Sequence, residues 1–179
     1  MNAEFVELPV TTSDGVFLAH YSELGLARLN FPNADGLLSP EQKTRGRAVS
    51  AKQIPLQILR WHRDATEALK SVLAGRATKK LPPLDWTGTT KFQQAVWRAM
   101  LKLGPGKTKS YGEIAEAIGK PKAVRAVGGA CGANPIPVLV PCHRVLAANK
   151  KIGGFSSGLD WKRRLLAKEG INFDPPSAG

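Results

Sequence analysis

Hydrophobic and polar positions alternate in short runs over the first part of the chain, which is the pattern of half-buried β-strands. Three such runs span residues 5–12, 16–21 and 24–31, and the turn signal Asp14-Gly15 separates the first two. We expect these runs to form a three-stranded meander. Residues 32–50 are rich in Asn, Asp, Gly, Ser, Pro and charged side chains, which predicts a long surface loop.

After residue 50 the spacing of the apolar residues changes from that of a strand to that of a helix. Apolar side chains recur at helical spacing from Ile58 to Leu73, and Gly75 is suited to end that helix. Residues 76–84 are basic and contain prolines, which is typical of a linker. We therefore predict two domains: an N-terminal α/β domain that includes the linker (residues 1–85) and a C-terminal domain (residues 86–179).

Helix signals dominate the second domain. Thr89 or Thr90 is suited to cap a helix that ends at Gly104-Pro105. The Ser-x-x-Glu sequence from Ser110 to Glu113 has the form of a capping box at the start of a short helix. The expected fold class is therefore α+β, with a small sheet and a helix in the first domain and a mostly helical second domain.

A further helix is expected to begin at Pro121 and to run to Cys131. With the short helix before it and the glycine-containing turn between them, it resembles a helix-turn-helix. Its only long side chains are those of Lys122, Val124 and Arg125. A helix that reads bases in the major groove needs several long polar side chains, so this one favours a close approach to the minor groove. Tight helix packing is the alternative reason for so many small residues.

Charge is distributed unevenly along the chain. The formal net charge is +12, and residues 86–179 carry 15 basic and 5 acidic side chains against 11 and 9 in residues 1–85. A basic half suits binding to a polyanion such as nucleic acid. A merely well-solvated basic surface is the alternative on charge alone.

Composition narrows the class of protein further. No run of apolar residues is long enough to cross a bilayer, and the acidic start of the chain does not look like a signal peptide, so we expect a soluble, cytoplasmic protein with no membrane partner. The two cysteines, Cys131 and Cys142, do not form a disulfide framework. His20 and His62 are far from both in sequence, so we expect no metal and no cofactor.

The chemistry is concentrated in residues 134–145, where three prolines oppose a helix and a central strand. We expect rigid, extended backbone that presents Cys142 and His143, with a histidine base to favour the reactive thiolate. A carboxylate has to orient the imidazole, and beyond Cys142 the chain offers three, of which we favour Glu169 over Asp160 and Asp174. The alternative is an inert core thiol beside a surface histidine.

Several motifs occur in an order that resembles the O6-alkylguanine-DNA alkyltransferases, also called methylated-DNA–protein-cysteine methyltransferases. The resemblance runs from about residue 92 to residue 170. Its motifs are Ser110-Tyr111, Pro121 to Ala130, Asn134-Pro135, Pro141 to Val145, Gly153 to Leu159 and Leu165 to Gly170. The family's fold then implies a ribonuclease H-like N-terminal domain and a winged-helix-like C-terminal domain.

The resemblance implies a protein that takes the alkyl group from O6 of guanine in double-stranded DNA, with O4-methylthymine as a further substrate, onto its own cysteine. The reaction is a single irreversible turnover without a cofactor. Cys142 is then the alkyl acceptor, His143 the base that acts through a water, and Glu169 the carboxylate that orients it. Tyr111 donates a proton toward N3 of the base, and Asn134 holds the turn before the active-site strand.

The resemblance also implies how DNA is bound. The protein is expected to bind as a monomer, and whether it binds cooperatively along DNA is left open. It places the helix of small residues in the minor groove and flips the damaged base out of the stack. Arg125 fills the space that the base leaves. The DNA-binding residues are then Lys122, Arg125, Ala126, Gly128 and Ala130, and the base pocket is formed by Val145, Phe155 and Ser156.

Two positions depart from the family's pattern. Phe155 replaces a tyrosine of many members, which affects the expected substrate range, and Cys131 lies at a variable position where we expect a packing role. Three other functions are alternatives. A lesion-binding alkyltransferase-like protein would lack the cysteine that is present here at position 142, a transcription regulator would need a base-reading helix, and a Cys-His hydrolase would not need a basic half.

Overall fold

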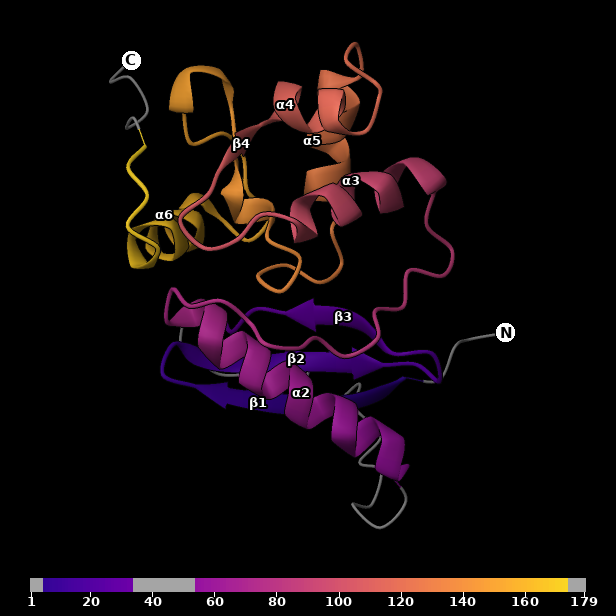
Figure 1. Ribbon diagram of the computed structural model, residues 1–179. Coiled ribbons are helices and arrows are strands. Elements are labelled where there is room, and N and C mark those ends of the chain that lie inside the picture. Colours follow the sequence, from indigo (N-terminus) through magenta and orange to yellow (C-terminus); the bar gives the residue numbers. More distant parts are fainter. Residues whose placement is uncertain (1–4, 34–53, 174–179) are drawn as a thin grey trace. The chain divides into compact units, whose positions relative to one another are not determined.

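The computed structural model describes residues 5–33 and 54–173, and the chain divides into two compact units (Figure 1). Unit 1 comprises Met1–Lys70 and Thr78–Trp86, and unit 2 comprises Ser71–Ala77 and Thr87–Gly179. The described residues form a small antiparallel sheet and five α-helices, which confirms the mixed α+β class. Most of the expected 32–50 loop, and Asp174, lie outside the described residues.

Unit 1 is built on the expected meander. Strands β1 (Val6–Thr12), β2 (Gly15–Tyr21) and β3 (Leu26–Asn30) are antiparallel in the order β1-β2-β3. The first hairpin turns at residues 13 and 14, where the Thr12 hydroxyl donates to the Gly15 carbonyl and accepts from the Asp14 amide. Helix α2 (Leu56–Leu73) lies across the sheet in Figure 1, and the Tyr21 hydroxyl lies 3.2 Å from Nδ1 of His62 on that helix.

The segment that the sequence predicts as a linker is held against strand β3. The Leu26 amide donates to the Pro83 carbonyl at 2.8 Å, and the Asp85 amide donates to the Leu26 carbonyl at 2.9 Å. Gly25, with φ +152°, allows this approach, because a Cβ there would lie 2.2 Å from the Pro83 oxygen. Residues 83–85 therefore extend the edge of the sheet and are not a linker without contacts.

Unit 2 contains the remaining helices and a short parallel strand pair. They are α3 (Lys91–Leu101), β4 (Lys109–Ser110), α4 (Tyr111–Ala117), α5 (Val124–Gly132), β5 (Val145–Leu146) and α6 (Leu159–Lys168). The expected capping box forms at Ser110, and Thr90, one of the two expected caps of α3, forms a second capping box with Gln93. Helix α5 packs against α3 and α4, and the Trp97 indole donates to the Ala130 carbonyl at 2.8 Å. No described helix has the length and apolar character that a membrane crossing requires.

Helix α5 begins three residues later than the sequence predicts. The Ala123 amide donates to the Lys120 carbonyl at 2.8 Å, which closes a turn whose central residues are Pro121 and Lys122. Proline is as well suited to the second position of a turn as to the first turn of a helix. Lys122 therefore lies in the turn before α5 and not on the helix.

The sequence predicts extended backbone over residues 134–145, but this segment is folded. The Val140 amide donates to the Ile136 carbonyl at 2.9 Å, and Cys142–Arg144 form a single 3₁₀ turn. Val138 has φ +73° and a fully buried side chain, which is a strained conformation for a β-branched residue. The prolines exclude a strand ladder here, but they permit this compact turn.

Candidate active site

Cys142 opens the 3₁₀ turn and is 4% exposed. The Asn134 side-chain amide donates to the Val140 carbonyl at 2.8 Å and to the Cys142 sulfur at 3.3 Å. The Asn134 oxygen in turn accepts from the Ile136 amide at 3.0 Å. One buried side chain therefore fixes both the turn and the position of the thiol.

His143, the residue after Cys142, forms a buried pair with Glu169. Nε2 of His143 lies 3.0 Å from Oε1 of Glu169, and both side chains are 0% exposed. An ionised carboxylate only accepts hydrogen bonds, so Nε2 carries the hydrogen and Nδ1 holds the free lone pair. Nδ1 is buried and has no hydrogen-bond partner among the residues that the structure describes. The pair therefore leaves one imidazole nitrogen available as a base.

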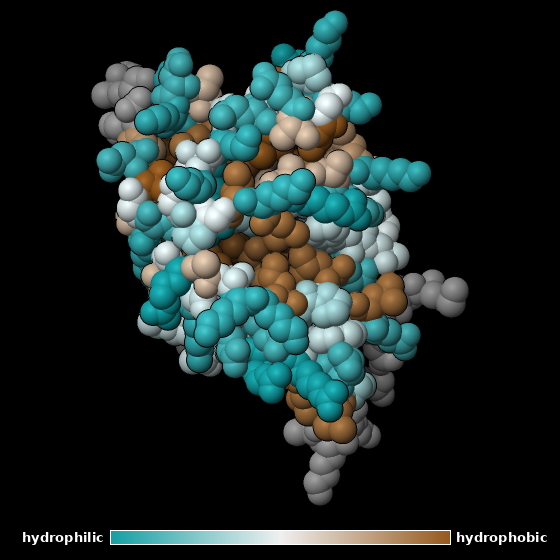
Figure 2. Space-filling model, in the orientation of Figure 1, coloured by the Kyte–Doolittle hydropathy of each residue, from teal (hydrophilic) through white to brown (hydrophobic). Residues whose placement is uncertain are grey.

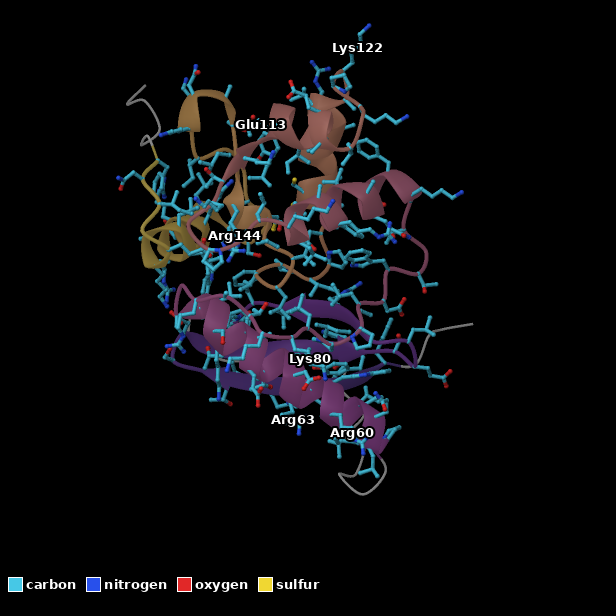
Figure 3. The ribbon with its side chains drawn as sticks, in the orientation of Figure 1. Arg60, Arg63, Lys80, Glu113, Lys122 and Arg144 are labelled. Atoms are coloured by element: carbon cyan, nitrogen blue, oxygen red, sulfur yellow. The ribbon has the colours of Figure 1, made fainter. Side chains whose placement is uncertain are left out.

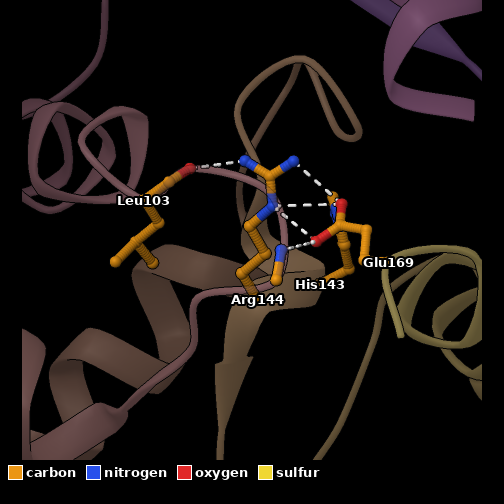
Figure 4. A network of polar contacts seen from close by, with 5 residues as sticks. Leu103, His143, Arg144 and Glu169 are labelled. Carbon is orange, nitrogen blue, oxygen red and sulfur yellow. Dashed lines mark hydrogen bonds and ion pairs between the residues drawn. The ribbon is translucent and has the colours of Figure 1, made fainter. Parts of the chain in front are cut away.

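Arg144 and a loop backbone complete the carboxylate's surroundings (Figure 4). Nε and Nη2 of Arg144 reach the Glu169 carboxylate at 2.8–3.1 Å, and Nη1 donates to the Leu103 carbonyl. The Gly106 amide donates to Oε2 of Glu169 at 3.2 Å. The carboxylate thus receives a forked guanidinium, a backbone amide and an imidazole, which fixes its position in the site.

These contacts set the charge states of the pair. Burial tends to raise the pKa of Glu169, but the hydrogen bonds and positive charge of His143 and Arg144 outweigh it and lower that pKa to about 2. Burial lowers the pKa of His143, and the hydrogen bond to Glu169 only partly opposes this. Near neutral pH the carboxylate is therefore ionised and the imidazole is neutral.

The thiol itself is protonated in this state. Burial raises the pKa of Cys142, while the hydrogen bond from Asn134 and the charge of Lys162 act in the opposite direction. A buried thiol becomes a nucleophile only when a base removes its proton. The site supplies such a base in the neighbouring imidazole.

Lys162 is a member of the site that the sequence analysis missed. Its side chain is fully buried in helix α6, and Nζ donates to the Val145 carbonyl at 2.8 Å and to the Gly154 carbonyl at 3.2 Å. Burial lowers its pKa to about 8. The signal was present in the sequence, because Lys162 shares a helical face with the apolar residues Leu159 and Leu166.

Tyr111 is the first residue of α4, directly after its Ser110 cap, and is half-buried. Burial raises the pKa of its phenol, and the nearby Cys131 and Cys142 sulfurs add to this effect, so the hydroxyl keeps its proton. A Cβ at Gly153 would lie 3.0 Å from the Tyr111 oxygen. The phenol and the glycine-rich segment that follows residue 152 therefore lie together.

The expected pocket and DNA-binding residues differ in exposure. Val145 is buried, Phe155 is half-buried and Ser156 is exposed. In the DNA-binding set, Lys122, Arg125 and Ala126 are exposed and Gly128 is half-buried. Figure 3 shows Lys122 pointing outward, and Figure 2 shows hydrophilic side chains projecting at the same end of unit 2.

Ala130 is the exception in the expected DNA-binding set. It is 3% exposed, and its carbonyl accepts the hydrogen bond from Trp97 of α3. Its side chain therefore belongs to the packed face of α5, which corrects its assignment to the DNA-facing surface. Cys131 follows on the same side, and its thiol lies 3.7 Å from the Met100 sulfur, as expected of a packing residue.

Residues 91–171 match the family model described as 6-O-methylguanine DNA methyltransferase, DNA binding domain. A relative named methylated-DNA–protein-cysteine methyltransferase from Mycolicibacterium paratuberculosis is 51% identical over 105 residues, which are 59% of this chain and 63% of that protein. The chain thus aligns with less than two thirds of that relative's length. A protein of the same name from Methanosarcina acetivorans is 48% identical over 111 residues, which are 60% of this chain and 69% of that protein.

Solved structures give the same result over more of the chain. Mycobacterium tuberculosis O6-methylguanine methyltransferase is 32% identical, with a TM-score of 0.66 over 97% of each chain. Mycobacterium tuberculosis OGT in complex with DNA is 36% identical, with a TM-score of 0.69 over 90% of each chain. The small sheet and helices of this protein match that architecture. The chain therefore belongs to the methylated-DNA–protein-cysteine methyltransferase family.

Proposed function

We propose that this protein repairs DNA by moving the alkyl group from O6 of guanine onto Cys142 in one irreversible reaction. The observation that carries the proposal is the arrangement of Cys142, His143 and Glu169: a buried thiol, held by Asn134, adjoins a neutral histidine whose other nitrogen is fixed by an ionised carboxylate. Membership in the family supports the same activity.

The chemistry proceeds by displacement at an sp³ carbon. Nδ1 of His143 accepts the Cys142 proton through a water, and the thiolate attacks the alkyl carbon. The C–S bond forms as the C–O6 bond breaks, and the electron pair moves onto guanine. Tyr111 donates its proton toward N3, so guanine leaves neutral, and the phenolate regains a proton from solvent. Because no group removes the alkyl from sulfur, each molecule reacts once.

DNA binding in this proposal uses the exposed part of α5 and the turn before it. Lys122 neutralises phosphate charge, while Ala126 and Gly128 let the helix approach the minor groove. O6 is inaccessible to the thiol in a stacked duplex, so the base is flipped out and Arg125 takes its place. Val145, Phe155 and Ser156 form the pocket for the flipped base. O6-methylguanine is the main substrate and O4-methylthymine a further one.

The proposal also assigns a fold type to each of the two units. We assign unit 1 to the ribonuclease H-like variable domain of the family, and unit 2 to a helix-turn-helix domain of winged-helix type. The α4–α5 pair and the residues that follow β5 support the second assignment. The protein acts as a monomer on double-stranded DNA.

Mass spectrometry tests the activity directly. The protein is incubated with duplex DNA that contains one O6-methylguanine, and its intact mass and peptides are measured. We expect one methyl group per molecule, on the peptide that holds Cys142, together with restored guanine in the DNA.

Two variants serve as matched controls for that experiment. Cys142→Ser removes the acceptor and should give no adduct while it still binds lesion DNA. Cys131→Ser alters the other buried thiol and should still give the adduct on Cys142. Tight lesion binding without an adduct in the wild type would contradict the proposal and indicate a lesion-flagging protein. The absence of both would contradict DNA repair altogether.

A further inference from the structure

A short hairpin follows strand β5 and has an unusual tip. The Ala147 amide donates to the Lys151 carbonyl at 2.8 Å, and the Lys151 amide donates to the Ala148 carbonyl at 3.3 Å. The two central residues, Asn149 and Lys150, have φ +55° and +57°. Two successive left-handed residues make a type I′ turn, in which asparagine followed by glycine is the favoured pair.

Lys150 therefore stands where glycine is favoured. A lysine in the left-handed region strains the backbone, and glycine would remove that strain. Packing does not explain the lysine, because residues 148–151 are all exposed. Among the residues that the structure describes, no carboxylate pairs with Lys150 or Lys151. A strained, exposed and unpaired lysine is explained by a partner outside the chain.

The stem of the hairpin is fixed beside the helix-turn-helix. Strand β5 pairs in parallel with β4, so that Ser110, the cap of α4, lies opposite Leu146. Gly153, two residues after the hairpin, lies close to the Tyr111 hydroxyl. In Figure 1 the hairpin (orange) and the turn before α5 lie at the same end of unit 2. The lysines are thus presented from the same end as the exposed residues of α5.

We propose that the 147–151 hairpin is a second contact to the DNA phosphate backbone, made by the ammonium groups of Lys150 and Lys151. This inference rests on the proposed DNA-repair function and deepens it. Ammonium groups are compact point charges that bind phosphate without base specificity. The hairpin therefore adds affinity for any duplex and holds unit 2 in register while α5 engages the lesion.

Lys150→Gly separates a binding role from a structural one, because the two predict opposite results. Relief of the left-handed strain should raise the thermal unfolding temperature of the free protein. Loss of one phosphate contact should weaken binding to an undamaged duplex by about three- to tenfold near 0.1 M salt and should reduce the slope of log K against log salt by about 0.9. Fluorescence anisotropy across a salt series measures both quantities.

Three further variants are matched controls. Asn149→Gly relaxes the same turn without a charge change and should leave DNA affinity unchanged. Lys151→Gln removes a charge at an ordinary φ of −63° and should weaken binding with no gain in stability. Lys70→Gln removes the charge of an exposed side chain on α2 in unit 1 and should leave the slope of log K against log salt unchanged. An equal slope change in Lys70→Gln would overturn the proposal, because the effect would then be one of net charge.

The hairpin proposal and the proposed function fail in different ways. If the wild type forms the methyl adduct but Lys150→Gly keeps the wild-type affinity and salt slope, the hairpin proposal is wrong and the repair function stands. If the wild type neither binds duplex DNA nor forms the adduct, the proposed function is wrong, and the hairpin proposal that rests on it is wrong as well. A Lys150→Gly protein that loses stability as well as affinity would also overturn the proposal, since the lysine would then be structural.

Discussion

The described residues include a histidine–glutamate pair in each unit, and the two pairs have the same separation. Nδ1 of His20 lies 3.0 Å from Oε1 of Glu7, and Nε2 of His143 lies 3.0 Å from Oε1 of Glu169. In unit 1 the two residues are direct cross-strand neighbours on β1 and β2. The separation of the two atoms alone therefore does not distinguish the pairs, although the unit 1 side chains are 11% and 17% exposed and the unit 2 side chains are fully buried.

The surroundings distinguish them. Oε2 of Glu7 and Nε2 of His20 are buried, and neither atom has a hydrogen-bond partner among the described residues, so half of this pair's polar atoms are unsatisfied there. In unit 2 Glu169 also binds Arg144 and the Gly106 amide, and the atom without a partner among the described residues is Nδ1 of His143, which follows Cys142 in the chain. The unit 2 pair, to which we assign the chemistry, thus differs from the unit 1 pair in a carboxylate with more hydrogen-bond donors.

Replacing each glutamate by glutamine should give the largest contrast. Glu169→Gln leaves the buried Arg144 charge without its partner and no longer fixes the imidazole. We expect alkyl transfer to slow by about 10²-fold or more and unfolding to require about 3 kcal/mol less. Glu7→Gln should leave transfer unchanged and cost about 1 kcal/mol of stability. Single-turnover kinetics and urea unfolding measure the two quantities, and equal transfer rates in the two variants would break the comparison.

Arg144→Lys tests how far the forked contact matters. Lysine keeps the charge but loses the two-pronged geometry that holds both carboxylate oxygens and the Leu103 carbonyl. We expect stability to fall by about 2 kcal/mol and transfer to slow by about tenfold. Wild-type transfer in this variant would show that the guanidinium supports the fold without positioning the chemistry.

Acid should remove the contribution of the unit 2 pair over a defined range. The pKa of Glu169 falls from 4.5 to about 2 on folding, so its ionised form stabilises the protein at pH values above 4.5. That stabilisation is lost as the pH falls from 4.5 toward about 2. The difference in unfolding free energy between wild type and Glu169→Gln should shrink across this range. A constant difference from pH 6 to pH 2 would contradict the assigned ion pairs.

The smallest effect is expected from removal of the unit 1 pair as a whole. The double variant Glu7→Leu/His20→Phe replaces two half-satisfied polar groups by apolar ones. We expect a change in unfolding free energy within about 1 kcal/mol and no change in alkyl transfer, because apolar replacement of a buried pair is often neutral or stabilising. A loss of transfer would mean that unit 1 acts on the chemistry.

The parts of the fold that local rules specify were predictable from the sequence. The meander follows from alternation and its turn residues, and helices α3 and α4 begin at their capping boxes. The first residue of α5 could not be predicted, because Pro121 satisfies the rules for the start of a helix and for a turn equally well. Helix α6 was not predicted at all, since charged residues interrupt its narrow apolar face.

The candidate site divides in the same way. Cys142, His143 and Glu169 carry motif and chemical signals, and the structure brings them together. The folded turn at Cys142 depends on hydrogen bonds from a side chain eight residues away, which no local pattern reveals. The Gly106 amide binds Glu169 through the backbone, and such a hydrogen bond cannot be predicted from the type of residue. Lys162 was missed because a lysine in a helix is usually solvated.

In the proposed reaction each molecule is used once, which gives the burial of Cys142 a further consequence. Peroxide and other small electrophiles attack exposed thiolates, and oxidation beyond the sulfenic acid or alkylation by such a reagent would irreversibly block the thiol of one copy of the protein. At 4% exposure and with its proton retained, the thiol offers these reagents little access. The same shielding that makes the group a poor nucleophile in the free protein would, in the proposed reaction, keep each molecule available until DNA delivers the alkyl carbon to it.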